Sequence, residues 1–178
     1  MSFLSLRPWR LDDVSSLLTV CASDDVTPYV GALQADDEAH RCIVRWQASQ
    51  AASESAVFAI AVDDVPVGGV ALQGIEHRNQ SAQMTYWLAE FTRGLGLASR
   101  AAAAVAAYGF GELGLHRLEL SHRVNHPKSR AVAVRAGFVA EGIERSKVLD
   151  DGERFDVETH ARLATDPVPD IETLPISE

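Results

Sequence analysis

The junction at residues 83–113 restricts the fold of this chain more than any other part of its sequence. The stretch QMTYWLAE alternates like a strand, and TRGLGLAS then places Gly94 and Gly96 two positions apart before an alanine-rich helix predicted over Leu95 to Leu113. Small side chains let a helix lie close to a sheet, so we expect this helix to be central and buried. A strand that leads directly into such a helix is typical of a parallel crossover connection.

The other elements follow from apolar periodicity and turn residues. Strands are predicted from Phe3 to near Pro8 and over Ala56 to Val62, Pro66 to Ile75, Ser81 to Ala89, His116 to Val124, Phe138 to Val148 and Arg154 to Leu163, with further helices over Leu11 to Ala22, Asp36 to Ala52 and Pro127 to Ala136. This order predicts one α+β domain, residues 1–165, around a mixed sheet. The tail, residues 166–178, has three prolines and four acids and is predicted to be mobile.

The formal charge of −9 disfavours nucleic acid as a partner, because an acidic surface repels phosphate backbones. A cationic partner is easier to accommodate. The two cysteines have no metal-ligand spacing, so no metal site is predicted. The amino terminus does not read as a secretory signal, and the apolar stretch Leu95 to Phe110 is interrupted by Arg100, so we expect no membrane span and a cytoplasmic location.

The glycine junction is suited to a phosphate group. A helix amino terminus presents unpaired N–H groups and about half a unit of positive charge. Gly94 and Gly96 remove the Cβ atoms that would keep a pyrophosphate away from those amides. The junction lacks the Gly-Lys-Ser/Thr ending of a P-loop, and no repeated βαβ unit with an acidic residue follows, as a dinucleotide fingerprint would need.

A resemblance to a known family gives this junction a function. Arg93, Gly96 and Ala98 fit the pattern Gln/Arg-x-x-Gly-x-Gly/Ala, the pyrophosphate loop of the GNAT superfamily of acyl-coenzyme A-dependent N-acyltransferases. The segments TYWLAEFTRGLGLASRA, RLELSHRVNHPKSRAVAVRAGFVAEGIER and LDDGERFDVETHARL resemble the RimJ/RimL branch, which includes amino-terminal acetyltransferases of ribosomal proteins. The resemblance spans roughly residues 3–163. It implies a single-domain GNAT fold with flanking helices and a splayed pair of parallel strands.

The resemblance also implies where acetyl-CoA would bind. Pantetheine would lie between the splayed strands, with its amides paired to backbone near Leu88, and the pyrophosphate would lie on the glycine loop. The implied cofactor-binding residues are Trp87, Leu88, Arg93, Gly94, Leu95, Gly96, Leu97, Ala98, Asn125, His126 and Ser129. Where the family usually has an asparagine three residues before the serine, this chain has His126, so His126 or Asn125 takes that contact or the site is weaker. His126 could instead cap the following helix or share an acid role.

Ser129 is the candidate catalytic hydroxyl, because the tyrosine that donates a proton in many relatives is replaced by Ala133. In the RimJ/RimL branch a serine in the first turn of this helix faces the cofactor sulfur. The alternative is a capping or first-turn hydrogen bond. The oxyanion donor would be a backbone amide of the splayed strand.

The general base is less defined. Glutamates that some relatives carry are replaced here by Gln83 and Val148, which leaves Glu90 and Glu141 as candidate catalytic carboxylates or as ordinary surface acids. An α-amine with a pKa near 7.7–8.0 is about 10% neutral at pH 7, whereas a lysine amine is less than about 0.1% neutral. The missing carboxylates therefore favour an α-amino or other weakly basic acceptor.

Acceptor recognition is expected from the first two helices and the loop between the last two strands. Acids that could attract a cationic acceptor are Asp24, Asp25, Asp36, Asp37 and Glu38. Trp46 and Trp87 either line the cleft or pack in the core. The main prediction is acetylation of a protein or peptide amino terminus. A small-molecule amine acetyltransferase and a non-catalytic acyl-CoA-binding module remain alternatives, and the last two strands could form a homodimer.

Overall fold

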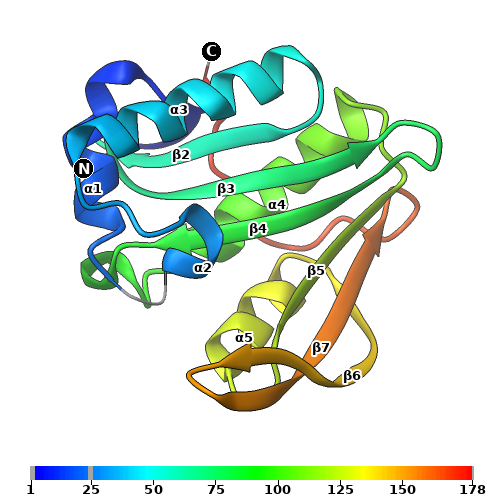
Figure 1. The fold of residues 1–178 in the computed structure, drawn as a ribbon. Coiled ribbons are helices and arrows are strands. Elements are labelled where there is room, and N and C mark those ends of the chain that lie inside the picture. The colour runs from blue at the N-terminus through cyan, green and yellow to red at the C-terminus, as the bar shows by residue number, and fades with distance from the viewer. Residues whose placement is uncertain (1–2, 24–25, 178) are drawn as a thin grey trace.

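The computed structural model describes residues 3–23 and 26–177. Its strands form one sheet in the order β1-β2-β3-β4-β5-β7-β6 (Figure 1). The strands are β1 Leu4–Pro8, β2 Ala56–Val62, β3 Val65–Glu76, β4 Ser81–Leu88, β5 Arg117–Arg123, β6 Val139–Asp150 and β7 Glu153–Leu163. Strands β4 and β5 are parallel and the other neighbouring pairs are antiparallel, which confirms the predicted mixed sheet.

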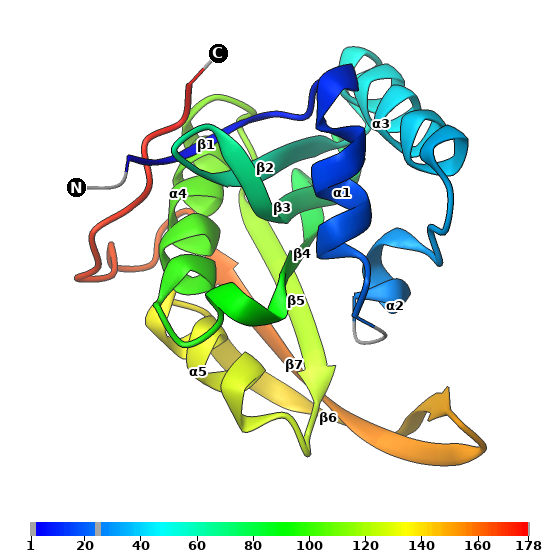
Figure 2. The same cartoon turned by 90° about the vertical axis from the view of Figure 1, so that its left-hand side faces the viewer.

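Helices cover both faces of the sheet. They are α1 Val14–Val20, α2 Thr27–Val30, α3 Asp36–Ala51, α4 Leu97–Gly111 and α5 Pro127–Arg135, with 3-10 turns at Leu11–Asp13 and Glu90–Thr92. Helices α1 and α3 lie on one face, and α4 and α5 lie on the other (Figure 2). The alanines of α4 other than the exposed Ala107 are buried, as expected for a helix close to the sheet. No helix in the described ranges is long and apolar enough to cross a membrane.

The first predicted helix is divided, and a buried ion pair explains the division. Asp13 accepts hydrogen bonds from both terminal nitrogens of Arg7, at 2.8 and 2.9 Å, and from the Arg10 amide at 2.8 Å. The hydrogen bond from the Arg10 amide to Asp13 holds Leu11–Asp13 in a 3-10 turn before α1 begins at Val14. The four-residue helix α2 was not predicted.

The tryptophans pack in the core on the α1 and α3 face. The Trp46 ring lies 5.4 Å from the Trp9 ring and 5.8 Å from the Trp87 ring, and all three side chains are buried. A Cβ on Gly69 would come within 2.3 Å of the Trp87 ring, so this glycine lets the indole lie across β3. Of the two predicted roles for Trp46 and Trp87, core packing is the one observed.

The described part of the tail, which was predicted to be mobile, lies against β1 and the core. Leu6 N–H donates to the Pro175 carbonyl and Ser177 N–H donates to the Leu6 carbonyl, both at 2.8 Å. The Leu174 side chain is 2% exposed and belongs to the core on the α4 side. In this arrangement one apolar side chain and the strand edge of β1 contact the segment.

Candidate functional site

Strands β4 and β5 separate after a short paired section. Their parallel pairing joins only Ser81, Ala82 and Gln83 to residues 117–119. Beyond Gln83, β4 continues to Leu88 with β3 as its partner, while β5 continues with β7 (Figure 1). Separated parallel strands leave backbone groups on their facing edges without a ladder partner. A ligand with amide groups can pair with such an edge.

The glycine loop follows directly from β4 and starts α4. Gly94 and Gly96 have φ of +82° and +77°, a left-handed conformation that favours glycine, and Gly96 is the N-cap residue. The first helical hydrogen bond runs from Arg100 N–H to the Gly96 carbonyl, so the N–H groups of residues 97–99 precede the helical ladder. The first turn of α4 contains no acidic residue. In a strongly acidic protein, this local composition suits an anion.

Arg93 occupies a backbone carbonyl in the region that the resemblance assigns to pantetheine. Its Nε and one terminal nitrogen donate to the Leu88 carbonyl at 3.1 and 2.8 Å. A ligand that pairs with this carbonyl must therefore displace the guanidinium. Leu95 is 69% exposed at the loop, and Leu97 and Ala98 are buried in the start of α4. The predicted loop residues are thus adjacent, whereas the side chain of Trp87 points to the opposite face.

Tyr86 connects the separated strand to the first turn of α5. Its phenol donates a hydrogen bond of 3.2 Å to the Ser129 carbonyl. Burial raises the pKa of Tyr86 to about 12, so the phenol stays protonated at neutral pH. Tyr86 was not among the predicted site residues. The alternation of β4 could have found it, because Met84, Tyr86 and Leu88 share the face that α4 and α5 cover.

Ser129 and His126 lie together at the start of α5. Ser129 N–H donates to the His126 carbonyl at 3.1 Å, and His126 is the N-cap residue, although its side chain makes no capping hydrogen bond. A terminal nitrogen of Arg123 lies 3.0 Å from His126 Nε2. Because a guanidinium can only donate, this Nε2 accepts and the ring is neutral in this arrangement. Asn125 is exposed in the turn before α5.

The two predicted carboxylates lie in different places. Glu141 forms a two-point ion pair with Arg117, at 3.0 and 2.5 Å, and the Arg117 hydrogen bonds lower the pKa of Glu141. Arg117 belongs to the paired end of β4 and β5, so this location does not favour Glu141 as a base. Glu90 is exposed in the turn after β4, four residues beyond Tyr86.

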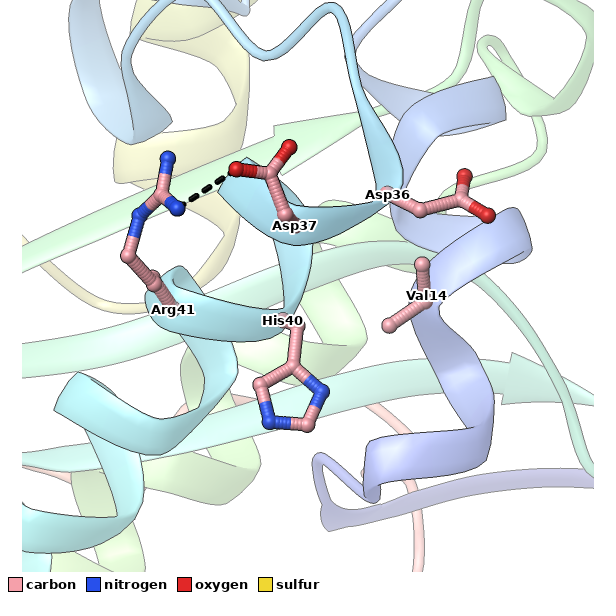
Figure 3. Close-up of a pocket in the computed structure, with 5 residues that line it drawn as sticks. All are labelled: Val14, Asp36, Asp37, His40 and Arg41. Atoms are coloured by element: carbon pink, nitrogen blue, oxygen red, sulfur yellow. Dashed lines mark hydrogen bonds and ion pairs between the residues drawn. The ribbon is translucent and has the colours of Figure 1, made fainter.

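The predicted acidic region lies on the outer side of α1 and α3. Asp36, Asp37 and His40 of α3 line an open depression of about 590 Å³ together with Arg41 and Val14. Asp37 points toward Arg41 and pairs with it at 2.5 Å, which lowers the pKa of Asp37 (Figure 3). Part of the acidic charge is therefore neutralised internally.

Of the other three acids in that prediction, the structure describes only Glu38. Glu38 accepts a hydrogen bond from the Gln34 amide at 2.7 Å, within the same segment. Asp24 and Asp25 lie outside the described residues. The structure therefore gives no acceptor geometry for this cluster.

Comparisons with known proteins agree with this geometry. A family model described as an acetyltransferase (GNAT) domain matches residues 4–139. The ribosomal-protein-serine acetyltransferase of Escherichia coli (strain K12) is 33% identical over 108 residues, which span 60% of this chain and only 60% of that relative.

Solved structures share the fold. RimL, a ribosomal L7/L12 alpha-N-protein acetyltransferase in complex with coenzyme A, has a TM-score of 0.82 at 23% identity, covering 90% of this chain and 94% of that one. A spermidine N-acetyltransferase SpeG chimera from Vibrio cholerae and hSSAT has a TM-score of 0.77 at 23% identity, covering 91% and 96%. Because the family model matches more than half of the sequence, the chain belongs to the GNAT family of acetyltransferases.

Proposed function

We propose that this protein transfers the acetyl group of acetyl-CoA to the α-amine of a protein or peptide amino terminus. The observation that carries the proposal is the separation of β4 from β5, which leads into a left-handed glycine loop and the amino end of α4. An extended ligand with amides near one end and a pyrophosphate near the other fits this sequence of groups. Coenzyme A has this chemistry.

The loop and the first turn of α4 would hold the pyrophosphate. The backbone from Gly94 to Ala98 supplies N–H donors, and positive φ at Gly94 and Gly96 keeps side chains away from them. Arg93 would leave the Leu88 carbonyl when pantetheine pairs with β4. The released guanidinium then becomes an additional cation beside the phosphates.

The chemistry needs an attacking amine nitrogen, a stabilised oxyanion and a stabilised leaving thiolate. A backbone N–H of the separated part of β4 would donate to the oxyanion. Tyr86 and Ser129 would face the departing sulfur. Full proton transfer from Tyr86, with a pKa of about 12, to a thiolate whose conjugate acid has a pKa of about 8.5 costs about 5 kcal/mol. Tyr86 therefore acts by orienting and hydrogen bonding rather than by giving up its proton.

The choice of acceptor follows from the lack of a well-placed general base among the candidates. Val148 and Gln83 stand where some relatives have glutamates, and Glu141 is committed to Arg117. Without a dedicated carboxylate, an amine that is already partly neutral reacts best, and an α-amine meets this condition. Resemblance to a ribosomal-protein-serine acetyltransferase supports the same acceptor class. Turnover on spermidine would instead indicate a small-amine acetyltransferase.

Release of CoA thiol across matched acceptors tests the proposal. The panel contains one peptide with a free amino terminus and an internal lysine, the same peptide with a blocked amino terminus, and spermidine. Cys21 and Cys42 are buried, and burial raises the pKa of Cys21 to about 12, so the enzyme itself consumes little thiol reagent. We expect turnover on the free peptide only, with mass spectrometry placing the acetyl group on its first residue. CoA binding without turnover on any acceptor would favour a non-catalytic module.

A further inference from the structure

Three side chains converge on the sheet face that α5 covers, outside the loop and strand edge described above. His122 lies on β5 opposite Glu158 of β7, and His160 lies two residues further along β7. The Nε2 atoms of the two histidines are 3.0 Å apart. Glu158 Oε2 is 3.0 Å from His160 Nε2 and 3.3 Å from His122 Nε2. The three atoms therefore form a nearly equilateral triangle.

With neutral rings and an ionised carboxylate, hydrogen bonding leaves one contact of this triangle without a proton. His122 Nδ1 lies 3.0 Å from the Arg123 carbonyl, which can only accept, so Nδ1 carries the proton and Nε2 presents a lone pair. An ionised Glu158 also presents only lone pairs. His160 Nε2 can offer one proton to these two acceptors, and the contact of 3.3 Å between His122 and Glu158 joins acceptor to acceptor. A cation at the centre would be shared by all three.

The carboxylate of Glu158 faces two buried imidazoles in this cluster. The two histidines are almost fully buried, with His160 at 1% and His122 at 7% exposure. A carboxylate facing two buried imidazoles is a ligand set that transition metals use.

We propose that His122, His160 and Glu158 bind a divalent transition metal ion, with Zn²⁺ the best match to two imidazoles and one carboxylate. Nitrogen and oxygen ligands at about 2.0–2.2 Å from a tetrahedral zinc ion are separated by roughly 3.3 Å. The observed separations of 3.0 to 3.3 Å require shifts of only a few tenths of an ångström. The carbonyl of Arg123 holds the His122 ring in the tautomer that ligation needs.

Arg130 is the group that opposes the ion. Its Nε lies 3.2 Å from the same oxygen of Glu158, but its side chain is 59% exposed and can turn into solvent. Because Arg130 follows Ser129 in the first turn of α5, the proposed metal site borders the turn that carries Ser129. Three protein ligands leave one coordination position for water or another donor. The inference does not depend on acetyl transfer.

Metal binding is measured on the full-length, tag-free protein, because a histidine tag would itself bind zinc. Equilibrium dialysis against Zn²⁺ gives stoichiometry and affinity, and visible absorption of the Co²⁺ form reports coordination geometry. The variants are Glu158→Gln, His122→Gln and Arg130→Gln, and His40→Gln is the matched control at an exposed histidine. Circular dichroism checks that each variant is folded.

We expect one ion per chain in the wild type and in His40→Gln. Glu158→Gln and His122→Gln should lose at least about tenfold in affinity. Arg130→Gln should bind more tightly, because it removes the competing cation; a purely structural cluster would not show this gain. The melting temperature should rise with Zn²⁺ for the wild type and not for Glu158→Gln. Equal zinc retention by the wild type and Glu158→Gln, or none by either, would overturn the proposal. The three side chains would then be joined by hydrogen bonds alone.

Discussion

Replacing Gly96 by alanine separates the proposed cofactor function of the loop from its role in the fold. Gly96 has φ of +77° at the start of α4, and an added Cβ there would meet no atom within 4 Å. Gly111, the last residue of the same helix, is equally open but has no positive φ. Gly96→Ala and Gly111→Ala therefore make the same chemical change at the two ends of one helix.

The two substitutions are expected to change the free energy of unfolding in opposite directions. A residue with a Cβ in the left-handed region costs about 1–2 kcal/mol, so Gly96→Ala should lower the free energy of unfolding by that amount. Gly111→Ala should raise it by about 0.4–1 kcal/mol, because alanine restricts the unfolded chain. A hydrogen bond to a charged group contributes about 1.5–3 kcal/mol, so blocking one phosphate contact at the loop should weaken CoA binding roughly 10- to 100-fold.

Urea denaturation measures the stability of each variant. Isothermal titration calorimetry, without urea, measures the affinity of each folded variant for CoA. Gly111→Ala should bind CoA like the wild type. If Gly96→Ala shows the loss of stability but keeps wild-type affinity, the backbone of this loop does not hold the pyrophosphate and the proposed cofactor site is wrong.

Three further substitutions test other parts of the structure. Tyr86→Phe should lose about 1 kcal/mol of stability at pH 7 with the hydrogen bond to Ser129. Since the pKa of Tyr86 is raised from 10.0 to about 12, the wild type keeps this stability below pH 10 and loses about 1.4 kcal/mol by pH 11, so the difference in alkaline urea titrations shrinks and then changes sign. Leu174→Ala should cost about 2–3 kcal/mol in urea denaturation, because the side chain is 2% exposed. Asp13→Asn should cost about 3 kcal/mol, since it leaves the buried Arg7 charge paired only with the exposed Asp64.

Each of these has a clear contrary result. A stability difference between Tyr86→Phe and the wild type that is constant from pH 8 to 11 would mean that the phenol is not buried as described. A loss below about 0.5 kcal/mol for Leu174→Ala would restore the mobile tail suggested by composition. An Asp13→Asn protein as stable as the wild type would show that Asp64 alone can neutralise Arg7.

Local patterns were sufficient for most elements. The apolar runs of β2 and β3, the alternation of β4, the alanine run of α4 and the Asp-Gly turn between β6 and β7 each depend on residues close together in the chain. The positions of these elements were therefore predicted to within a few residues. The exceptions depend on burial and packing that the local pattern does not show. The 3-10 turn before α1 depends on Arg7 meeting Asp13 in a buried space, and the docked tail depends on Leu174 reaching the core beside β1.

The part of the candidate site that could be predicted from the sequence consists of backbone groups. Gly94 and Gly96 precede a helix in the sequence, and a helix amino end has the same chemistry wherever it lies, so the loop could be inferred without coordinates. Side-chain roles were harder. Glu141 looked like a free carboxylate until strand pairing brought Arg117 to it, and Tyr86 gained a role only when β4 was placed beside α5.

The chain's own pattern thus determined the order of its elements, the parallel crossover and the left-handed glycine loop, because these arise from neighbours in sequence. The tertiary structure alone decided which polar side chains meet. His122 stands 36 and 38 residues from Glu158 and His160, and only the antiparallel register of β5 with β7 brings their ligand atoms within 3.3 Å. Pairing across a sheet depends on the whole fold, so no spacing rule along the chain predicts it.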